Sequence, residues 1–216
     1  MINDRLKTSH DYYAIDRSKL LKLISGTPMR VLELGCGTGG LLKELKKLGC
    51  GYVCGIEIRE DIAIQARMDA GADEIFVADI EMNAPDLTAE SFDLIIASHV
   101  LEHMVDPWKV TKLLASWLKP GGQFIGAIPN VRHLRVVLPL LFKGAWSYEE
   151  SGLLDWTHLR FFTRFEIKKL IESAKLEVEG IYPEIGGPKS ELLRVLSLGL
   201  LTDFSAYAYN FSAWKK

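Results

Sequence analysis

The chain has 216 residues, enough for one domain with a full hydrophobic core. Apolar residues make up 48% of the chain and charged residues 25%, a balance that excludes a disordered protein. The net charge of −2 offers no electrostatic basis for nonspecific binding of nucleic acid.

Cysteine content and apolar runs indicate the compartment. Cys36, Cys50 and Cys54 are too few for a disulfide framework, and no nearby His or Cys pair completes a zinc site. The longest apolar stretches, residues 136–142 and 192–201, fall short of the ~20 residues that span a bilayer, so no transmembrane segment is expected. The polar start of the chain shows no secretory signal. We therefore expect a cytoplasmic protein with reduced thiols.

Strand-like apolar runs alternate with segments of helical period, which predicts a mostly parallel sheet covered by helices on both faces. A leading helix is expected at residues 16–24. Strands are expected at residues 29–34, 52–58, 74–78, 92–97, 123–128, 175–182 and 204–214.

The helices between these strands have recognisable signals. Leucines at positions 41, 42, 45 and 48 recur at helical spacing, and a second helix starts with Asp106 as N-cap and Pro107 in its first turn. Thr163 and Glu166 have capping-box spacing before a third helix. A further helix is expected at residues 190–200.

Residues 130–162 interrupt this alternation, because they are too many for a simple connection between a strand and a helix. Insertions at the carboxyl edge of a parallel sheet commonly form lids over a ligand. We therefore divide one domain into an N-terminal cap (1–28), a core (29–128), a lid (130–162) and a C-terminal helix with a strand hairpin (163–216).

The sequence VLELGCGTGG, residues 31–40, is the sharpest signal. A strand leads into Gly35, Gly37, Gly39 and Gly40, which allow tight turns and close approach of the backbone to a ligand. The glycines alone also satisfy the dinucleotide pattern G-x-G-x-x-G.

Acidic residues separate the two interpretations. Glu33 precedes the first glycine by two residues, where a carboxylate suits a cationic ligand group and disfavours a pyrophosphate. Glu57 ends the second strand, where a carboxylate accepts from ribose hydroxyls, as it also does in NAD enzymes. Asp79 follows the third strand and is placed to accept from the amine of adenine.

Together, VLELGCGTGG, Glu57, VADIE, FDLIIASHVLEH and LKPGG resemble the successive motifs of class I S-adenosylmethionine-dependent methyltransferases. The resemblance implies a Rossmann-like seven-stranded α/β sheet with an antiparallel last strand, and a methionine pocket walled by residues 98–102. The cofactor would be S-adenosylmethionine, with S-adenosylhomocysteine as product. The cofactor-binding residues expected on this basis are Glu33, Gly35, Cys36, Gly37, Gly39, Glu57, Ile58, Asp79, Ile80, Ser98 and His99.

The second half is similar to a narrower bacterial branch of the family, through DYY (11–13), IPNVRH (128–133), WSY (146–148) and LLDWTHLRFFT (153–163). Such members act on small polar acceptors, including sugars and their nucleotide- or lipid-linked forms. The resemblance therefore implies methylation of a small polar acceptor, and O-methylation is our first hypothesis.

A hydroxyl acceptor needs a base, and His158 with Asp155 three residues earlier is our first candidate pair. The alternative is that His158, Asp155 and Arg160 only lock the lid. His99, His103 and His133 are the other candidate bases. The residues expected to bind the acceptor are Tyr12, Tyr13, His103, Trp146, Tyr148 and Arg160. The aromatic residues could equally form a small core of the lid, and His103 could be a packing residue.

Several further interpretations remain open. A nicotinamide-dependent oxidoreductase and a non-catalytic methyltransferase-fold binding protein are the alternative functions. No metal is expected, because His99 and His103 have ligand spacing but lack a third ligand. The apolar run from Leu192 to Leu201 either packs on the sheet or forms a face for a homodimer or a lipid-linked acceptor.

Overall fold

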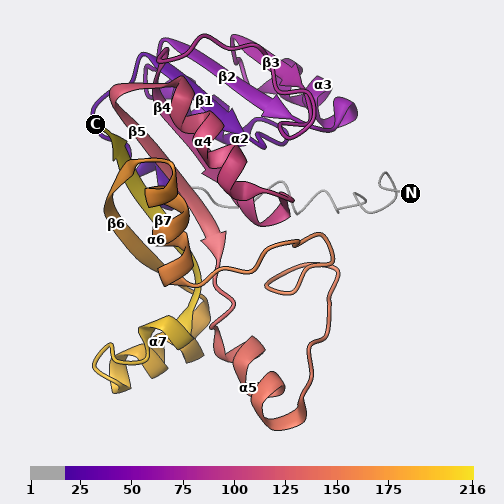
Figure 1. Cartoon of the computed structure of the whole chain (residues 1–216), viewed down its shortest axis with the longest axis vertical. Coiled ribbons are helices and arrows are strands. Elements are labelled where there is room, and N and C mark those ends of the chain that lie inside the picture. Colours follow the sequence, from indigo (N-terminus) through magenta and orange to yellow (C-terminus); the bar gives the residue numbers. More distant parts are fainter. Residues whose placement is uncertain (1–17) are drawn as a thin grey trace.

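The structure, a computed structural model, describes residues 18–216 and contains a seven-stranded sheet in the order β3-β2-β1-β4-β5-β7-β6 (Figure 1). All neighbouring strands are parallel except β7, which runs antiparallel to both β5 and β6. This confirms the predicted sheet with its antiparallel last strand. The strands are β1 (Arg30–Leu34), β2 (Tyr52–Glu57), β3 (Glu74–Val77), β4 (Phe92–Ser98), β5 (Leu118–Pro129), β6 (Leu176–Ile185) and β7 (Ala206–Lys215).

Helices cover both faces of the sheet, as the alternating pattern predicts. One face packs against α1 (Ser18–Leu21), α2 (Gly40–Lys47) and α3 (Glu60–Asp69), and the other against α4 (Pro107–Trp117) and α6 (Arg164–Ser173). The predicted caps are present: the Asp106 carboxylate accepts from the Lys109 amide, and the Thr163 hydroxyl accepts from the Glu166 amide. The leading helix is shorter than predicted, and residues 16 and 17 lie outside the described part of the chain.

Some boundaries differ from the predictions for local reasons. Helix α3 was not predicted, because it buries only Ile62 and two alanines and has little apolar periodicity. Strand β5 starts five residues early, since Leu118 already pairs with Phe92 across a register shift.

The C-terminal prediction of a helix at 190–200 is also corrected. Helix α7 (Gly187–Leu196) starts earlier because Pro188 stands in its first turn, and it ends before Leu198, whose φ of 51° is left-handed. A short helix, α8 (Thr202–Ser205), then delays the last strand to Ala206.

The lid leaves and returns at the carboxyl end of β5, as predicted. Asn130 and Phe162 form an isolated bridge, and the amide of Val131 donates to the Phe162 carbonyl at 3.0 Å. The lid contains helix α5 (Leu134–Lys143), which was not predicted, and a small core around Leu153 and Leu154. In residues 18–216, no helix is long and apolar enough to cross a membrane.

Candidate active site

The residues expected to bind a cofactor gather at one edge of the sheet. Strands β3, β2, β1 and β4 are adjacent and parallel, so the segments that follow them share the carboxyl edge. These segments hold the glycine loop, Glu57 with Ile58, Asp79 with Ile80, and Ser98 with His99. Ligands of open α/β sheets bind at this edge.

The glycine loop needs its glycines for both conformation and space. Gly35, Gly37 and Gly39 have φ values of 67°, 55° and 81°, which side chains rarely adopt. A Cβ on Gly39 would lie 2.5 Å from the Cβ of Ala70, so α2 and α3 pack closely at this point. The loop is therefore held in one tight path into the first turn of α2.

Glu57 fixes this loop to the second strand, a role that sequence analysis did not foresee. Its Oε2 accepts from the Gly37 amide at 2.9 Å and its Oε1 from the Arg59 amide at 3.0 Å. The Glu57 side chain is buried. Glu33 of β1, which pairs with Gly55 of β2, is also buried. Two carboxylates thus flank the loop.

The other predicted positions line the same edge. Ile58 is exposed beyond the end of β2, whereas Ile80 and Ser98 are buried. The Asp79 carboxylate accepts from the Glu81 amide at 2.9 Å and so orders the turn after β3. His99 has a φ of 51°, and its amide donates to the Ala127 carbonyl of β5. A non-glycine residue in this region is uncommon and marks a constrained position.

Next to His99 lies a buried carboxylate that sequence analysis treated only as part of a pocket wall. Glu102, in the short 3-10 helix η3 (Leu101–His103), is fully buried, and neither carboxylate oxygen makes a hydrogen bond within residues 18–216. His99 Nδ1 lies 3.5 Å from its Oε1. Burial opposes ionisation of Glu102, but the contact with His99, together with the positive charge that the His103, His99 and His158 imidazoles carry when protonated, outweighs it and lowers the carboxyl pKa. Glu102 is therefore an anion enclosed by imidazoles.

The end of the lid is bound to this residue through the backbone. The amides of Leu159 and Arg160 both donate to the Glu102 carbonyl, at 2.9 and 3.0 Å. The rings of His103 and His158 then meet edge to face with centroids 4.8 Å apart. Residues separated by more than fifty positions in the sequence thus form one cluster.

The hydrogen bonds of the two histidines determine which nitrogen carries the proton. His158 Nδ1 lies 3.2 Å from the Leu153 carbonyl, and His103 Nδ1 lies 3.1 Å from the Thr157 carbonyl. A carbonyl oxygen only accepts, so Nδ1 is the protonated nitrogen and Nε2 holds the lone pair in each neutral ring. Burial lowers the pKa of His158, against an opposing effect of the Glu102 carboxylate, so its neutral form is favoured.

Asp155 contacts a different neighbour from the one expected. Its Oδ1 accepts from the amide and the hydroxyl of Thr157, at 2.7 and 2.6 Å. The Thr157 hydroxyl in turn lies 3.0 Å from His103 Nδ1, whereas His158 is oriented by the Leu153 carbonyl. Asp155 thus supports the cluster through Thr157 rather than by a hydrogen bond to His158.

The remaining lid residues have mainly structural contacts. Trp146 packs edge to face on Phe161 in the lid core, and Tyr148 stacks on the exposed Trp156. Arg160 donates to the Val105 carbonyl. These contacts favour a place in the small core of the lid for Trp146, whereas the exposed Tyr148 and Trp156 lie outside that core.

The three other predicted residues are His133, Tyr12 and Tyr13. His133 is buried and caps α5, with Nδ1 accepting from the Arg135 amide. Tyr12 and Tyr13 lie outside the described residues.

Comparison with known proteins identifies the family to which this chain belongs. A family described as "Methyltransferase domain" matches residues 8–180, which is most of the chain. This chain belongs to the class I S-adenosylmethionine-dependent methyltransferases. The assignment removes the nicotinamide-dependent oxidoreductase from consideration.

Curated relatives of this methyltransferase include a protein named ubiquinone biosynthesis O-methyltransferase from Neisseria meningitidis, 30% identical over 160 residues. The match covers 69% of this chain and 64% of the relative. The human mitochondrial protein of the same name is 29% identical, over 81% of this chain and 50% of its own length. The chain thus spans less than two thirds of the length of these curated relatives.

Solved structures show the same fold. An S-adenosylmethionine-dependent methyltransferase from Archaeoglobus fulgidus superposes with a TM-score of 0.71 at 18% identity, covering 99% of this chain and 98% of that one. A Thermotoga maritima methyltransferase, described as a possible histamine N-methyltransferase, has a TM-score of 0.66 at 21% identity, covering 95% of this chain and 89% of that one.

One group in the described part of this methyltransferase could hold a metal ion. Glu102, His103 and His158 each offer a ligand atom, and these atoms lie within 4.8 Å of one another. The sequence-based expectation of no metal rested on the lack of a third ligand, and folding supplies one. Bonds of about 2.1 Å, typical of zinc, place two ligand atoms at most about 4.2 Å apart, so the group must contract to bind an ion.

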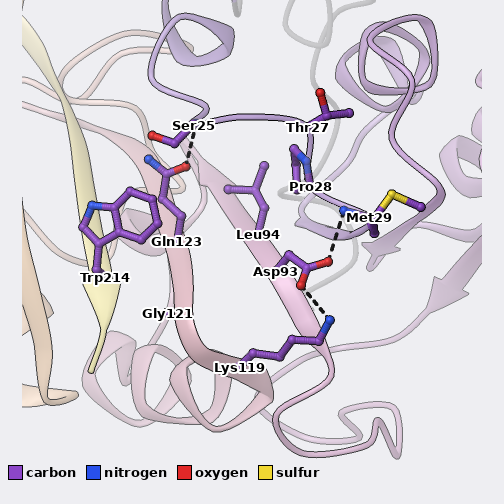
Figure 2. A pocket seen from close by; sticks show the side chains of 10 residues that line it. All are labelled: Ser25, Thr27, Pro28, Met29, Asp93, Leu94, Lys119, Gly121, Gln123 and Trp214. Carbon is purple, nitrogen blue, oxygen red and sulfur yellow. Dashed lines mark hydrogen bonds and ion pairs between the residues drawn. The ribbon is translucent and has the colours of Figure 1, made fainter.

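A pocket of about 340 Å³ lies at the opposite edge of the sheet (Figure 2). Its polar groups differ from those of the Glu102 cluster, because they bind one another. Asp93 accepts from the Met29 amide and pairs with Lys119 at 2.6 Å, and Gln123 accepts from the Ser25 amide. Its charged and amide groups are therefore paired with one another, as expected of a structural contact between the entry to β1 and the start of β5.

Proposed function

We propose that the chain transfers a methyl group from S-adenosylmethionine to a hydroxyl oxygen of a small polar acceptor. The observation that carries the proposal is the position of His158: its Nδ1 lies 3.2 Å from the Leu153 carbonyl, which leaves the lone pair on Nε2, and the ring offers an atom within 4.8 Å of the buried Glu102 carboxylate. A neutral imidazole backed by a carboxylate is suited to take a hydroxyl proton.

The carboxyl edge fits the cofactor chemically. The buried Glu33 suits the ammonium of the methionine end, and Glu57 can accept from ribose hydroxyls while it holds the loop. The exposed Ile58 offers an apolar surface to the adenine beside Asp79. We propose the same roles for the loop glycines, Cys36, Ile80, Ser98 and His99 as the resemblance implies.

When bound, S-adenosylmethionine supplies an electrophilic methyl group on a positively charged sulfur. The acceptor oxygen forms a bond to the methyl carbon as the carbon–sulfur bond breaks and its electron pair stays on sulfur. His158 Nε2 takes the hydroxyl proton, and Glu102 stabilises the imidazolium that results. The lid excludes water and aligns the acceptor, since alignment supplies most of the rate enhancement in such a displacement.

The acceptor class follows from two sources. The lid motifs resemble those of proteins acting on sugars or sugar-linked metabolites, whereas the curated relatives are named for a step of ubiquinone biosynthesis. We propose a sugar or sugar-linked hydroxyl first, and a phenol as the second class. An aliphatic hydroxyl is the weaker acid, so it depends more on His158.

The test is transfer of a labelled methyl group to a panel of sugars, sugar nucleotides and phenols. The expected result is transfer to one class, with calorimetric binding of S-adenosylhomocysteine and none of NAD. A protein that binds neither adenosyl compound contradicts the proposal. Binding of both adenosyl compounds without transfer to any acceptor would favour the non-catalytic binding protein.

We also propose a cytoplasmic location, supported by the three cysteines, which are all free thiols. We also propose that the apolar run from Leu192 to Leu201 meets a lipid-linked acceptor, with a homodimer contact at the same run as the alternative.

A further inference from the structure

Helix α7 and the turns after it bury almost none of their apolar side chains. No residue of α7 is buried, although four of its ten residues are leucine or valine. In the turns that follow, Leu198 is 91% exposed and Leu200 86% exposed. Packing on the sheet therefore does not explain this apolar run.

Helix α5 of the lid has the same property. Its only buried residue is Val136, and its apolar second half ends in Leu141 and Phe142, which are 69% and 76% exposed. An amphipathic helix that covers a core normally buries its apolar stripe. Here the apolar stripe faces outward.

Both helices lie at the same end of the molecule, beyond the carboxyl end of β5 (Figure 1). His133, the N-cap of α5, places its Nε2 3.4 Å from the Ser190 hydroxyl of α7. Arg132 pairs with Asp203 of α8 at 2.8 Å. The exposed apolar residues of α5 and α7 thus belong to one end of the molecule.

The same two segments are strongly basic. Residues 131–144 and 186–201 contain Arg132, Arg135, Lys143, Lys189 and Arg194 against the single acid Glu191, a net charge of +4, or +3 when Asp203, the partner of Arg132, is included. The whole chain carries −2, so all other residues together carry −6. Arg135, Lys143 and Lys189 form no ion pair within the described chain.

We propose that α5 and residues 187–201 form a docking surface for an anionic lipid bilayer. Apolar side chains insert at the boundary between headgroups and acyl chains, and the surrounding lysines and arginines are attracted by anionic headgroups. A symmetric contact with a second copy is disfavoured because it would bring two positively charged surfaces together. Docking does not depend on the methyl-transfer proposal, but it would turn the lid toward acceptors held in the membrane.

The experiment is flotation of the full chain with vesicles of phosphatidylcholine alone and with 30% phosphatidylglycerol, at about 0.05 M and 0.5 M salt. Binding to the anionic vesicles is expected to exceed binding to neutral ones at least fivefold and to fall at high salt. The double variant Leu198→Ser/Leu200→Ser should lose at least fivefold of the bound fraction, and Lys143→Glu/Lys189→Glu should do the same.

Two controls keep the result specific. Met82→Ser changes an equally exposed apolar residue outside this surface, and Lys168→Glu changes an exposed lysine of α6; both should bind as the parent does. Affinity for S-adenosylhomocysteine should be unchanged in every variant, which shows that the fold is intact. Equal binding to neutral and anionic vesicles, no binding at all, or a dimer in light scattering that the leucine variant dissolves would each overturn the proposal.

Discussion

Glu57→Gln removes one charge from the buried link between the glycine loop and β2, with almost no change in shape. The carboxylate accepts two backbone hydrogen bonds, at 2.9 Å from Gly37 and 3.0 Å from Arg59. A glutamine keeps one acceptor oxygen and turns its amide group toward the other N–H. Hydrogen bonds to charged groups contribute about 1.5–3 kcal/mol each, so we expect a loss of about that size in the free energy of unfolding.

The same change should weaken cofactor binding. If Glu57 also accepts from the ribose, loss of its charge costs a further ~1.5–3 kcal/mol, which is a roughly 10- to 150-fold rise in the Kd for S-adenosylhomocysteine. Titration calorimetry measures the Kd, and urea unfolding measures stability. Glu60→Gln, the same substitution on the exposed first turn of α3, is the matched control and should change neither.

The two measurements separate the two roles. A variant that loses stability but binds S-adenosylhomocysteine within twofold of the parent would show that Glu57 only fixes the loop. A variant unchanged in both would refute the argument, because the two buried hydrogen bonds would then contribute nothing measurable.

Four further predictions test the rest of the site. His158→Ala should lower turnover by roughly 10²–10⁴-fold with cofactor affinity nearly unchanged, and Asp155→Asn should lower it less; normal turnover with a lower melting temperature would make His158 a strut of the lid. Burial lowers the pKa of His158 below 6.5, so activity should rise with pH through a value below 6.5 and stay level above it. Glu102→Gln removes the carboxylate that raises this pKa, so the rise in activity should move to still lower pH. Full activity after chelation is expected; a loss that one divalent ion restores would assign a metal to Glu102 and His158. Gly39→Ala should destabilise the fold by about 1–3 kcal/mol more than Gly71→Ala, since both have positive φ but only Gly39 has a neighbour within contact distance of the new Cβ.

Local patterns were sufficient for the core of the fold. The strands that precede the glycine loop, Glu57 and Asp79 start and end within a residue or two of their predicted positions, because buried parallel strands are continuous apolar runs. The N-caps Asp106 and Thr163 were predicted because capping depends on residues only three positions apart.

Helices α3 and α5 were missed for opposite reasons. Helix α3 faces the sheet with small alanines, which give little contrast between its two sides. Helix α5 is apolar on its exposed side, so its pattern indicates no core-facing stripe. Apolar periodicity predicts a helix only when the apolar side chains are on its buried face and the polar ones on its exposed face.

The cluster of Glu102, His103 and His158 could not be predicted from the sequence for a different reason. It joins η3 to the end of the lid, and no local rule specifies that the amides of Leu159 and Arg160 meet the Glu102 carbonyl. Only the order of the strands brings the segment after β4 beside the segment that returns to β5. The signal available in the sequence was the His-x-x-Glu-His spacing from residue 99 to 103, which places three ionisable groups within one turn.

The two sequence-based interpretations of His158, a base and a strut of the lid, use different atoms of one ring. Nδ1 donates to the Leu153 carbonyl and so ties the ring to the lid core. That same bond places the proton on Nδ1 and leaves the lone pair on Nε2, in a ring that lies beside Glu102 and His103. Holding the lid therefore selects the tautomer that a base requires, and a residue chosen for one role is already prepared for the other.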